Sequence, residues 1–392
     1  MTRTTDDPRE TARGIPRWSL VLLVATVGAA SLTFCYLLHD GASSWLYARA
    51  YSDFSTADAA ASDAADDYLG LVTRADRTTA QSDALEAVAD PAYAGADAAT
   101  ALAEASDEFA TTLADAPDGE LAPFVGVIPP AKHTVPAWDR YADAAELLES
   151  RELRLAEIAE FEAASREIAS ARTLALDSQE AIFAGVAATG EQAIADHPSA
   201  TYRSRIGVQH AIDQSGDGWT YAHDSASAFS ATVLAIDELR ASHAAEEARR
   251  LEPEYPVRAE IEAFSRSIAG GVNLDFAWAH EVNGLSSDEW YSGTAEFLPS
   301  DGGWGTISLT HSVSDNWADD INAKAVVVHE VGHTQAIRPI CEPLFTGPEF
   351  AGDHEMWATA WAIGMGYDMP GSGIEAYGRP SDAQIAVASG CR

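Results

Sequence analysis

The sequence predicts an α+β domain in the C-terminal part of the chain, preceded by an all-α domain and one N-terminal transmembrane helix. Three observations lead to this fold class. An uncharged run lies near the N-terminus, a long segment rich in Ala, Glu, Asp, Leu and Arg follows it, and strand-like runs occur after about residue 252. A chain of 392 residues has room for two or three domains of ordinary size.

The first element is the run from Trp18 to Leu38, which holds 21 residues without a charged side chain. At about 1.5 Å of rise per residue, a helix of this length crosses a hydrocarbon core of roughly 30 Å. Four arginines precede the run and one follows it closely: Arg3, Arg9, Arg13, Arg17 and then Arg49. By the positive-inside rule we expect a cytoplasmic tail over residues 1–17, a transmembrane helix over 18–38, and the rest of this single-pass protein outside the cell membrane. A cleaved signal peptide is the alternative, but its apolar region should be shorter, about 7 to 15 residues.

Residues 39–251 are predicted to form an all-α ectodomain, a helical stalk or bundle. From about Ser55 onward, helix-favouring residues dominate and β-branched runs are scarce. Six apolar residues recur at helical spacing and are expected to share one buried face: Tyr141, Ala145, Leu148, Leu155, Ile158 and Phe161. Segments with proline or glycine at 122–136 and 213–219 predict loops between helices. The sequence does not indicate a partner for this domain.

Residues 252–392 are predicted to form the α+β domain. Two prolines in RRLEPEYPVRAE mark the boundary near residue 252. A short helix over about 259–269 is expected to precede a strand in GGVNLDFAWAH and a hairpin of GTAEFL and GTISLTHSV that turns at PSDGGW. A helix over about 318–336 then carries the segment HEVGH in its second half.

The cysteines indicate the redox compartment of the chain, and the net charge indicates which partners to expect. Cys341 and Cys391 lie in the part that is expected to be exported, where an even pair usually closes a disulfide bond; two free buried thiols are the alternative. Cys35 lies inside the apolar run.

The chain carries 24 Lys+Arg against 61 Asp+Glu, which gives a net charge of −37. Nucleic acid is not expected as a partner, because polyphosphate binding requires a basic surface.

The segment HEVGH places His329 and His333 four residues apart, with Glu330 directly after the first histidine. On a helix both imidazoles project from one face and can reach one metal ion, while Glu330 can address a water molecule on that ion. The valines before His329 are typical of a helix buried beneath a cleft. The alternative is a core helix whose two histidines are hydrogen-bonded and bind no metal.

A catalytic zinc usually takes three protein ligands, so a third ligand is expected elsewhere. The metzincin arrangement would need Gly at 336 and His at 339, but Ala336 and Pro339 stand there. Downstream, GDHEMWATAWAIGMG predicts a second helix that presents Glu355 toward the first. The adjoining Asp353 and His354 are alternative third ligands.

With HEVGH followed 22 residues later by Glu355, the sequence resembles the gluzincin group of zinc metallopeptidases, in particular its small single-lobed members. The resemblance covers roughly residues 256–392 and implies a zincin-like fold there. It further implies that His329, His333 and Glu355 bind Zn²⁺ and that Glu330 is the general base.

Two positions depart from the family pattern. Thr359 stands where many relatives have an aspartate that orients a ligand histidine, so its hydroxyl is expected to take that role less strongly. Gln335 stands where an apolar residue is usual. These departures favour the alternative function, a non-catalytic surface interaction protein with a degenerate zincin-like domain.

The ligand set and the resemblance imply a membrane-anchored extracellular peptidase that acts on protein or peptide substrates. Zinc would lower the pKa of a water toward about 7, Glu330 would accept its proton, and the hydroxide would attack the peptide carbonyl. A second donor to the oxyanion is expected from Tyr367, Tyr377 or His354. The strand GTISLT is expected to be an edge strand that pairs with an extended peptide. His280 and His311 are expected to be structural or surface residues, with His311 at the end of this strand near the cleft.

Overall fold

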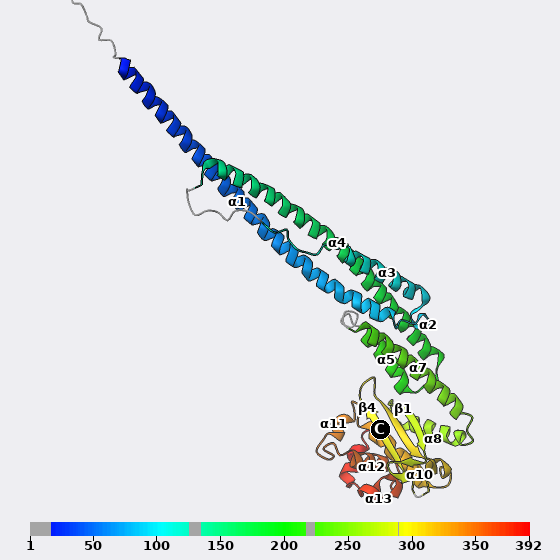
Figure 1. Ribbon diagram of the computed structural model, residues 1–392. Coiled ribbons are helices and arrows are strands. Elements are labelled where there is room, and N and C mark those ends of the chain that lie inside the picture. Colours follow the sequence, from blue (N-terminus) through cyan, green and yellow to red (C-terminus); the bar gives the residue numbers. More distant parts are fainter. Residues whose placement is uncertain (1–16, 125–134, 217–223, 289) are drawn as a thin grey trace, which may run out of the picture. The chain divides into compact units, whose positions relative to one another are not determined.

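The computed structural model describes residues 17–124, 135–216, 224–288 and 290–392. Its elements run from α1 (Arg17–Glu86) to α14 (Asp382–Ala388), as Figure 1 shows. Contacts between residues divide the chain into two compact units, one of residues up to Thr79 with Asp107–Leu174, the other of Ala80–Ser106 with Ala175–Arg392. Three arginines of the predicted cytoplasmic tail, Arg3, Arg9 and Arg13, lie outside the described residues, as do parts of both predicted loops.

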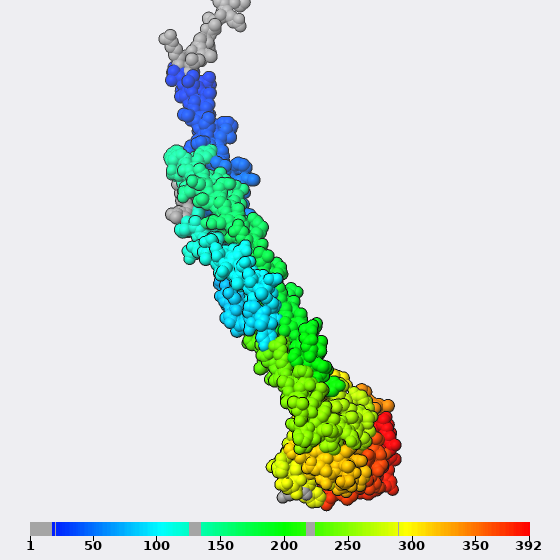
Figure 2. All heavy atoms as spheres, turned by 90° about the vertical axis from the view of Figure 1, so that its right-hand side faces the viewer, coloured from blue at the N-terminus to red at the C-terminus, as the bar shows by residue number. Residues whose placement is uncertain are grey.

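The N-terminal part of α1 is apolar and uncovered. An 18-residue window near its start has a mean hydropathy of 2.1, and none of that window is buried. In Figure 2 this part of the helix, coloured blue, has no other described segment packed around it. The chain therefore has one N-terminal helix that is long and apolar enough to span a membrane, as predicted. The helix does not end at Leu38 but continues to Glu86, because the following residues are rich in alanine and contain no proline.

In the first unit, α1 pairs with α4 (Ala137–Asp196), and the two helices run parallel (Figure 1). Side-chain hydrogen bonds join them, for example Arg140 to Ser43, Arg154 to Asp58, and Arg172 to Thr78. Residue numbers rise together along both helices, which fixes the parallel direction. The chain must therefore return between them, and Tyr68 of α1 donates a hydrogen bond of 2.6 Å to the carbonyl of Pro117 on this return segment.

The buried face of α4 differs from the predicted one. Of the six residues expected there, Phe161 is buried, whereas Ala145, Leu148 and Leu155 are exposed. The buried stripe instead has spacings of three, four and seven residues, typical of a coiled-coil seam: Arg140, Ala144, Leu147, Arg154, Phe161 and Ile168. The prediction was wrong because it followed the larger apolar residues, whereas alanines and two arginines occupy seam positions. The arginines are paired there with carboxylates of Asp40, Asp58 and Glu157.

The second unit begins with a helical part. It consists of the end of α1, α2 (Pro91–Ala94), the start of α3 (Ala96–Ala114), the part of α4 from Ala175 onward, α5 (Tyr202–Ser215) and α7 (Ser225–Arg249). Each helix contributes to one apolar core, for example through Leu85, Ala94, Leu102, Ile182, Val208 and Phe229.

A small α/β region completes the second unit. After α8 (Tyr255–Ile268), a mixed sheet is formed in the order β1 (Asn273–Ala279), β5 (Trp304–Thr310), β4 (Gly293–Leu298). β4 and β5 form the predicted antiparallel hairpin, and β1 is parallel to β5. A two-stranded ribbon of β2 (Glu281–Val282) and β3 (Leu285–Ser286) lies between β1 and β4 in the sequence.

The strand order corrects one expectation. GTISLT belongs to β5, which is hydrogen-bonded on both sides and so cannot pair with a peptide. Among the described strands, β4 is the edge strand of this hairpin, because it pairs with β5 alone. The sequence could not assign the edge, since the partner of β5 on its other side is a strand some thirty residues earlier.

Helices pack on this sheet and complete the core. α10 (Ile321–Gln335) contacts β4, β5 and α12 (His354–Gly364), and its valines share a core with Ile307 and Leu309 of β5. The remaining short elements are α9 (His311–Asp315), α11 (Glu342–Phe345), the 3₁₀ turn η1 (Pro370–Ser372), α13 (Ile374–Tyr377) and α14. Cys341 and Cys391 form the predicted disulfide bond, and Trp361 of α12 donates to the carbonyl of Cys391 at 2.7 Å.

The helical part and the sheet are joined within the second unit by Asp275 of β1. Its carboxylate accepts hydrogen bonds from the backbone N–H groups of Tyr202 and Arg203, at 2.8 and 2.9 Å, in the first turn of α5. Burial raises the pKa of Asp275, and these two N–H groups oppose that rise. The boundary that the prolines predict near residue 252 therefore lies inside one compact unit.

Candidate metal centre

The two histidines of HEVGH lie on the part of helix α10 that is buried on every side, from Ala325 to Gln335. α10 begins after Asp320, whose carboxylate accepts a hydrogen bond of 2.8 Å from the N–H of Asn322. His329 and His333 follow one turn apart, with ring centroids 4.8 Å apart and ring planes at 90°. Both are buried, so their imidazoles are held by the surrounding core.

Glu355 reaches the histidines because α12 crosses closely over α10. Asp353 is the N-cap of α12, where its carboxylate accepts from the N–H of Met356 at 3.1 Å, and Glu355 follows in the first turn. A Cβ on Gly332 would lie 3.1 Å from the backbone of Ala358, so the glycine of HEVGH permits this approach. Trp357 fixes the crossing by donating to the carbonyl of Gly332 at 3.1 Å.

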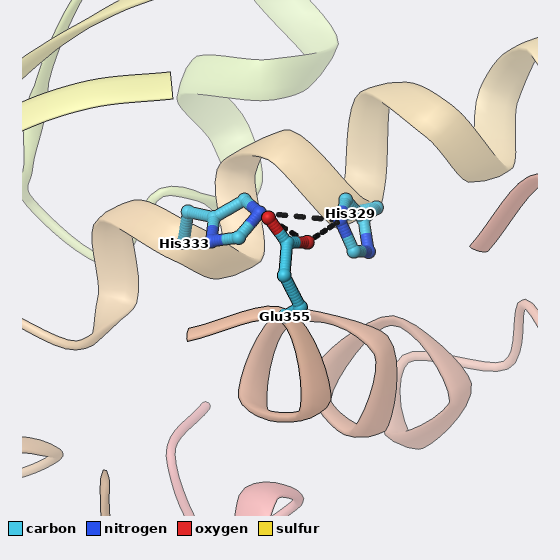
Figure 3. Close-up of side chains that lie close together, drawn as sticks. All are labelled: His329, His333 and Glu355. Carbon is cyan, nitrogen blue, oxygen red and sulfur yellow. Dashed lines mark hydrogen bonds and ion pairs between the residues drawn. The ribbon is translucent and has the colours of Figure 1, made fainter. Parts of the chain in front are cut away.

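The three donor atoms form a nearly equilateral triangle, shown in Figure 3. His329 Nε2 lies 3.2 Å from Glu355 Oε2 and 3.2 Å from His333 Nε2, and His333 Nε2 lies 3.3 Å from Glu355 Oε2. In a tetrahedral site with ligand distances of about 2.0–2.1 Å, two ligand atoms are about 3.3–3.4 Å apart. The separations therefore fit three ligands of one metal ion, and the group could bind one.

The tautomer of His329 supports the same conclusion. Its Nδ1 lies 2.9 Å from the carbonyl oxygen of Ser372, and because a carbonyl only accepts, Nδ1 carries the proton. In the neutral ring, Nε2 then has a lone pair directed at the nitrogen of His333 and the carboxylate of Glu355. A cation between these atoms would stabilise an arrangement in which lone pairs otherwise face each other.

The charges of the group are strongly coupled. Burial would raise the pKa of Glu355, but the adjacent imidazoles of His329 and His333 hold it well below its usual range. Burial would lower the pKa of His333, yet the hydrogen bond with Glu355 and the charges of Glu330 and Glu355 raise it overall. The site thus already favours a positive charge among the three donors.

Glu330 lies beside the donor group but does not belong to it. Its side chain is buried, and this burial raises its pKa. Together with His329 it lines a cavity of 860 Å³, whose other walls include Trp290, Tyr291 and Tyr377. A Cβ on Gly293 would lie 2.5 Å from Cγ of Glu330, so the edge strand β4 begins directly against this carboxylate.

The three expected oxyanion donors have different places. Tyr377 stacks on His329, with centroids 5.8 Å apart and planes at 7°, and it lines the same cavity. Burial and the carboxylates of Glu355 and Glu330 raise its pKa to about 12. His354 instead contacts the ring of Phe345 at a centroid distance of 4.5 Å, and Tyr367 packs against the core. Of the three, Tyr377 is beside the donor group and the cavity.

Neither alternative third ligand belongs to the donor group. Asp353 caps α12, and the ring of His354 lies beside the group, with its centroid 6.4 Å from that of His333. His280 is exposed near Asp288, and His311 begins α9.

The two departures from the family pattern also have defined places. Thr359 donates to the carbonyl of Glu355 at 2.8 Å, so the expectation that its hydroxyl orients a histidine was wrong. Gln335 is buried and donates to the carbonyl of Ala269 at 3.1 Å, while its oxygen accepts from Arg338 at 2.9 Å. This amide therefore ties the end of α10 to the connection between α8 and β1.

Sequence reasoning missed the residues that orient His329. They are the carbonyl of Ser372 and the adjoining Gly373, which has a φ of 96° and where a Cβ would lie 2.4 Å from Thr359 Oγ1 and 2.8 Å from the His329 ring. The sequence MPGSG signals a turn there, but a backbone carbonyl has no residue signature.

A comparison of the chain with protein-family models, curated proteins and solved structures finds no match.

Proposed function

We propose that this chain is a membrane-anchored, zinc-dependent peptidase with a zincin-like C-terminal domain. The observation that carries the proposal is the triangle of His329, His333 and Glu355 donor atoms with buried Glu330 beside it on an 860 Å³ cavity. Two imidazoles and one carboxylate are the ligand set of several zinc hydrolases, which keep a further position open. When bound, zinc supplies Lewis acidity and makes a water molecule a stronger acid.

Glu330 is the proposed general base. A base works best when its pKa lies near the working pH, and burial moves the pKa of Glu330 in that direction from the usual carboxylate range. Because Glu330 adjoins a ligand without being one, it can accept a proton from the attacking water. The same group can then pass that proton to the leaving amine.

Tyr377 is the proposed second donor to the oxyanion. Its raised pKa keeps the phenol protonated at neutral pH, so the hydroxyl can donate a hydrogen bond as negative charge develops on the carbonyl oxygen. The stacking of its ring on His329 holds it at the site.

The edge strand β4 is the proposed peptide-binding strand. Its free edge can pair with an extended peptide, and its first residue, Gly293, adjoins Glu330. This arrangement would lay a peptide backbone along the cavity that contains the general base.

The topology follows from the sequence. With α1 spanning the cell membrane and the arginines at its N-terminal end, the N-terminus would be cytoplasmic and the peptidase domain extracellular. The disulfide bond supports this location, because such bonds persist in oxidising compartments.

Metal analysis of the purified chain tests the proposal. We expect about one zinc per chain, loss of that zinc in His333→Ala, and retention in the control His311→Ala, together with chelator-sensitive cleavage of a peptide library. A wild-type zinc content near zero would contradict the metal site. Zinc without cleavage of any peptide would favour the alternative, a non-catalytic surface interaction protein with a structural metal.

A further inference from the structure

The first turn of α4 is clamped to α1 just beyond the apolar run. The guanidinium of Arg140 forms an ion pair with Asp40 and donates to Ser43 Oγ at 3.0 Å, and the ring of Tyr141 lies 5.1 Å from that of His39. These partners on α1 follow Leu38 directly. The first turn of α4 therefore lies at the level where the apolar run ends.

Two tryptophans are exposed near this level, one on each helix. Trp138 of α4 has 68% of its surface exposed and Trp45 of α1 has 66%. Trp18, at the other end of the apolar run, is 67% exposed. Large aromatic side chains left in water on two adjoining helices suggest a further contact.

The spacing along α1 identifies that contact. Trp18 and Trp45 are 45 − 18 = 27 residues apart, which at about 1.5 Å per residue is roughly 40 Å. A bilayer with its headgroup layers is about 40–45 Å thick, and tryptophan is enriched at both of its interfaces. The two tryptophans of α1 are thus placed where the two headgroup layers would be.

The register of the two helices places Trp138 at the same end of the apolar run as Trp45, because Arg140 pairs with Asp40 and Tyr141 lies beside His39. Helix side chains lean toward the N-terminus of their helix. Because α1 and α4 are parallel, both helices lean their side chains toward the apolar run. Arg140 does not oppose membrane contact, since it is 8% exposed and paired with Asp40.

We propose that Trp138 and Trp45 form an interfacial aromatic belt that seats the first turn of α4 in the headgroup layer of a bilayer. α4 is then a second point of membrane contact for the first unit. The neighbouring Asp139 is exposed, so the contact fits zwitterionic rather than anionic headgroups. The proposal rests on α1 spanning a membrane, which is part of the proposed function, and does not depend on the metal chemistry.

Quenching of tryptophan fluorescence by brominated lipid tests the belt. The full chain is reconstituted in phosphatidylcholine vesicles whose acyl chains are either plain or brominated near the headgroups. If Trp18, Trp45 and Trp138 contribute equally, Trp138→Phe loses about one third of the quenched amplitude. This substitution removes little packing, because the side chain is mostly exposed.

A matched variant keeps the number of tryptophans. Leu153 is 57% exposed on the same helix, and it lies 15 residues, or roughly 22 Å, farther from the start of α4. In the double variant Trp138→Phe/Leu153→Trp, we expect the quenched amplitude to remain as low as in the single variant.

Two results overturn the belt. The first is a quenched amplitude in Trp138→Phe equal to that of the wild type while Trp18→Phe loses its share, which leaves the anchor intact. The second is no loss in either Trp18→Phe or Trp138→Phe; the anchor then fails together with the belt.

Discussion

At the scale of single residues, the donor group is prepared for a cation before one is bound. The carbonyl of Ser372 holds the proton on Nδ1 of His329, and Glu355 interacts with both histidines. Glu330 stands apart from these interactions. In the proposed function, metal binding and proton transfer therefore belong to different side chains, and substitutions can separate them.

Glu330→Gln is expected to reduce peptide hydrolysis by about 10²- to 10⁴-fold while zinc stays bound. Glutamine keeps the shape of the side chain but cannot accept the proton. Steady-state cleavage and metal content of the same sample check this. Undiminished cleavage by a zinc-loaded Glu330→Gln variant would show that another group is the base.

In the metal-free protein a proton takes the place of the cation. The folded-state pKa of His333 lies above its ordinary 6.5, so its stabilisation is fully present below 6.5 and is lost as the pH rises through the raised value. Burial also raises the pKa of Glu330, so its contribution to stability is present below its ordinary pKa of 4.5 and is lost as the pH rises through the raised value. Glu355 has a lowered pKa, so its contribution is present above 4.5 and is lost as the pH falls through the lowered value.

We therefore expect the Tm of the chelated protein to fall as the pH rises above 6.5, and that of the zinc-loaded protein to change less. Thermal unfolding across this pH range, with chelator and with zinc, measures both. His333→Gln should flatten the curve of the chelated protein, whereas His311→Gln should leave it as in the wild type. Parallel curves with and without zinc would contradict the proton-for-metal exchange.

At the scale of elements, the site depends on how α10, α12 and η1 meet. The local parts of this arrangement could be predicted: HEVGH on a helix, the hairpin of β4 and β5, and Glu355 on a following helix. The seam of α4 and the edge strand could not, because burial and strand order depend on partners far away in the sequence. The carbonyl of Ser372 could not be predicted either, since every residue has one.

Gly373→Ala tests the contact between η1 and His329. Gly373 and Gly378 both have positive φ, 96° and 87°, but a Cβ would meet Thr359 and His329 at Gly373 and nothing within 4 Å at Gly378. Both substitutions should cost about 1–3 kcal/mol of stability through backbone strain. Only Gly373→Ala should also weaken zinc binding, measured by competition with a chelator. Equal zinc affinity in the two variants would show that the contact does not position the histidine.

At the scale of the whole molecule, one covalent bond closes the α/β region. Cys341 and Cys391 are 50 residues apart and enclose α12, which carries Glu355. The expected stabilisation from closing a loop of this size is about 4 kcal/mol. The bond therefore holds the helix that carries Glu355 as well as the end of the described chain.

Replacing both cysteines, Cys341→Ser with Cys391→Ser, is expected to lower the free energy of unfolding by about 2–5 kcal/mol. Denaturant unfolding of the second unit measures this loss, and Cys35→Ser, which removes the free cysteine of α1, is the control that should leave it unchanged. No difference between the double variant and the control would mean that the bond adds no stability.

Because α1 pairs with α4 rather than with the helix that follows it, the first unit cannot be completed early during synthesis. The contacts of Arg140 with Asp40, Arg154 with Asp58 and Arg172 with Thr78, which join the two helices, connect residues 94 to 100 positions apart. Translation at about 5–20 residues per second leaves roughly 5 to 20 s between the appearance of each partner. During that time the face of α1 that packs against α4 is not covered by α4. Contacts between residues so far apart in the sequence also slow folding. Helical proteins ordinarily fold fast because their contacts are local, whereas α1 can pair only after α4 has been synthesised.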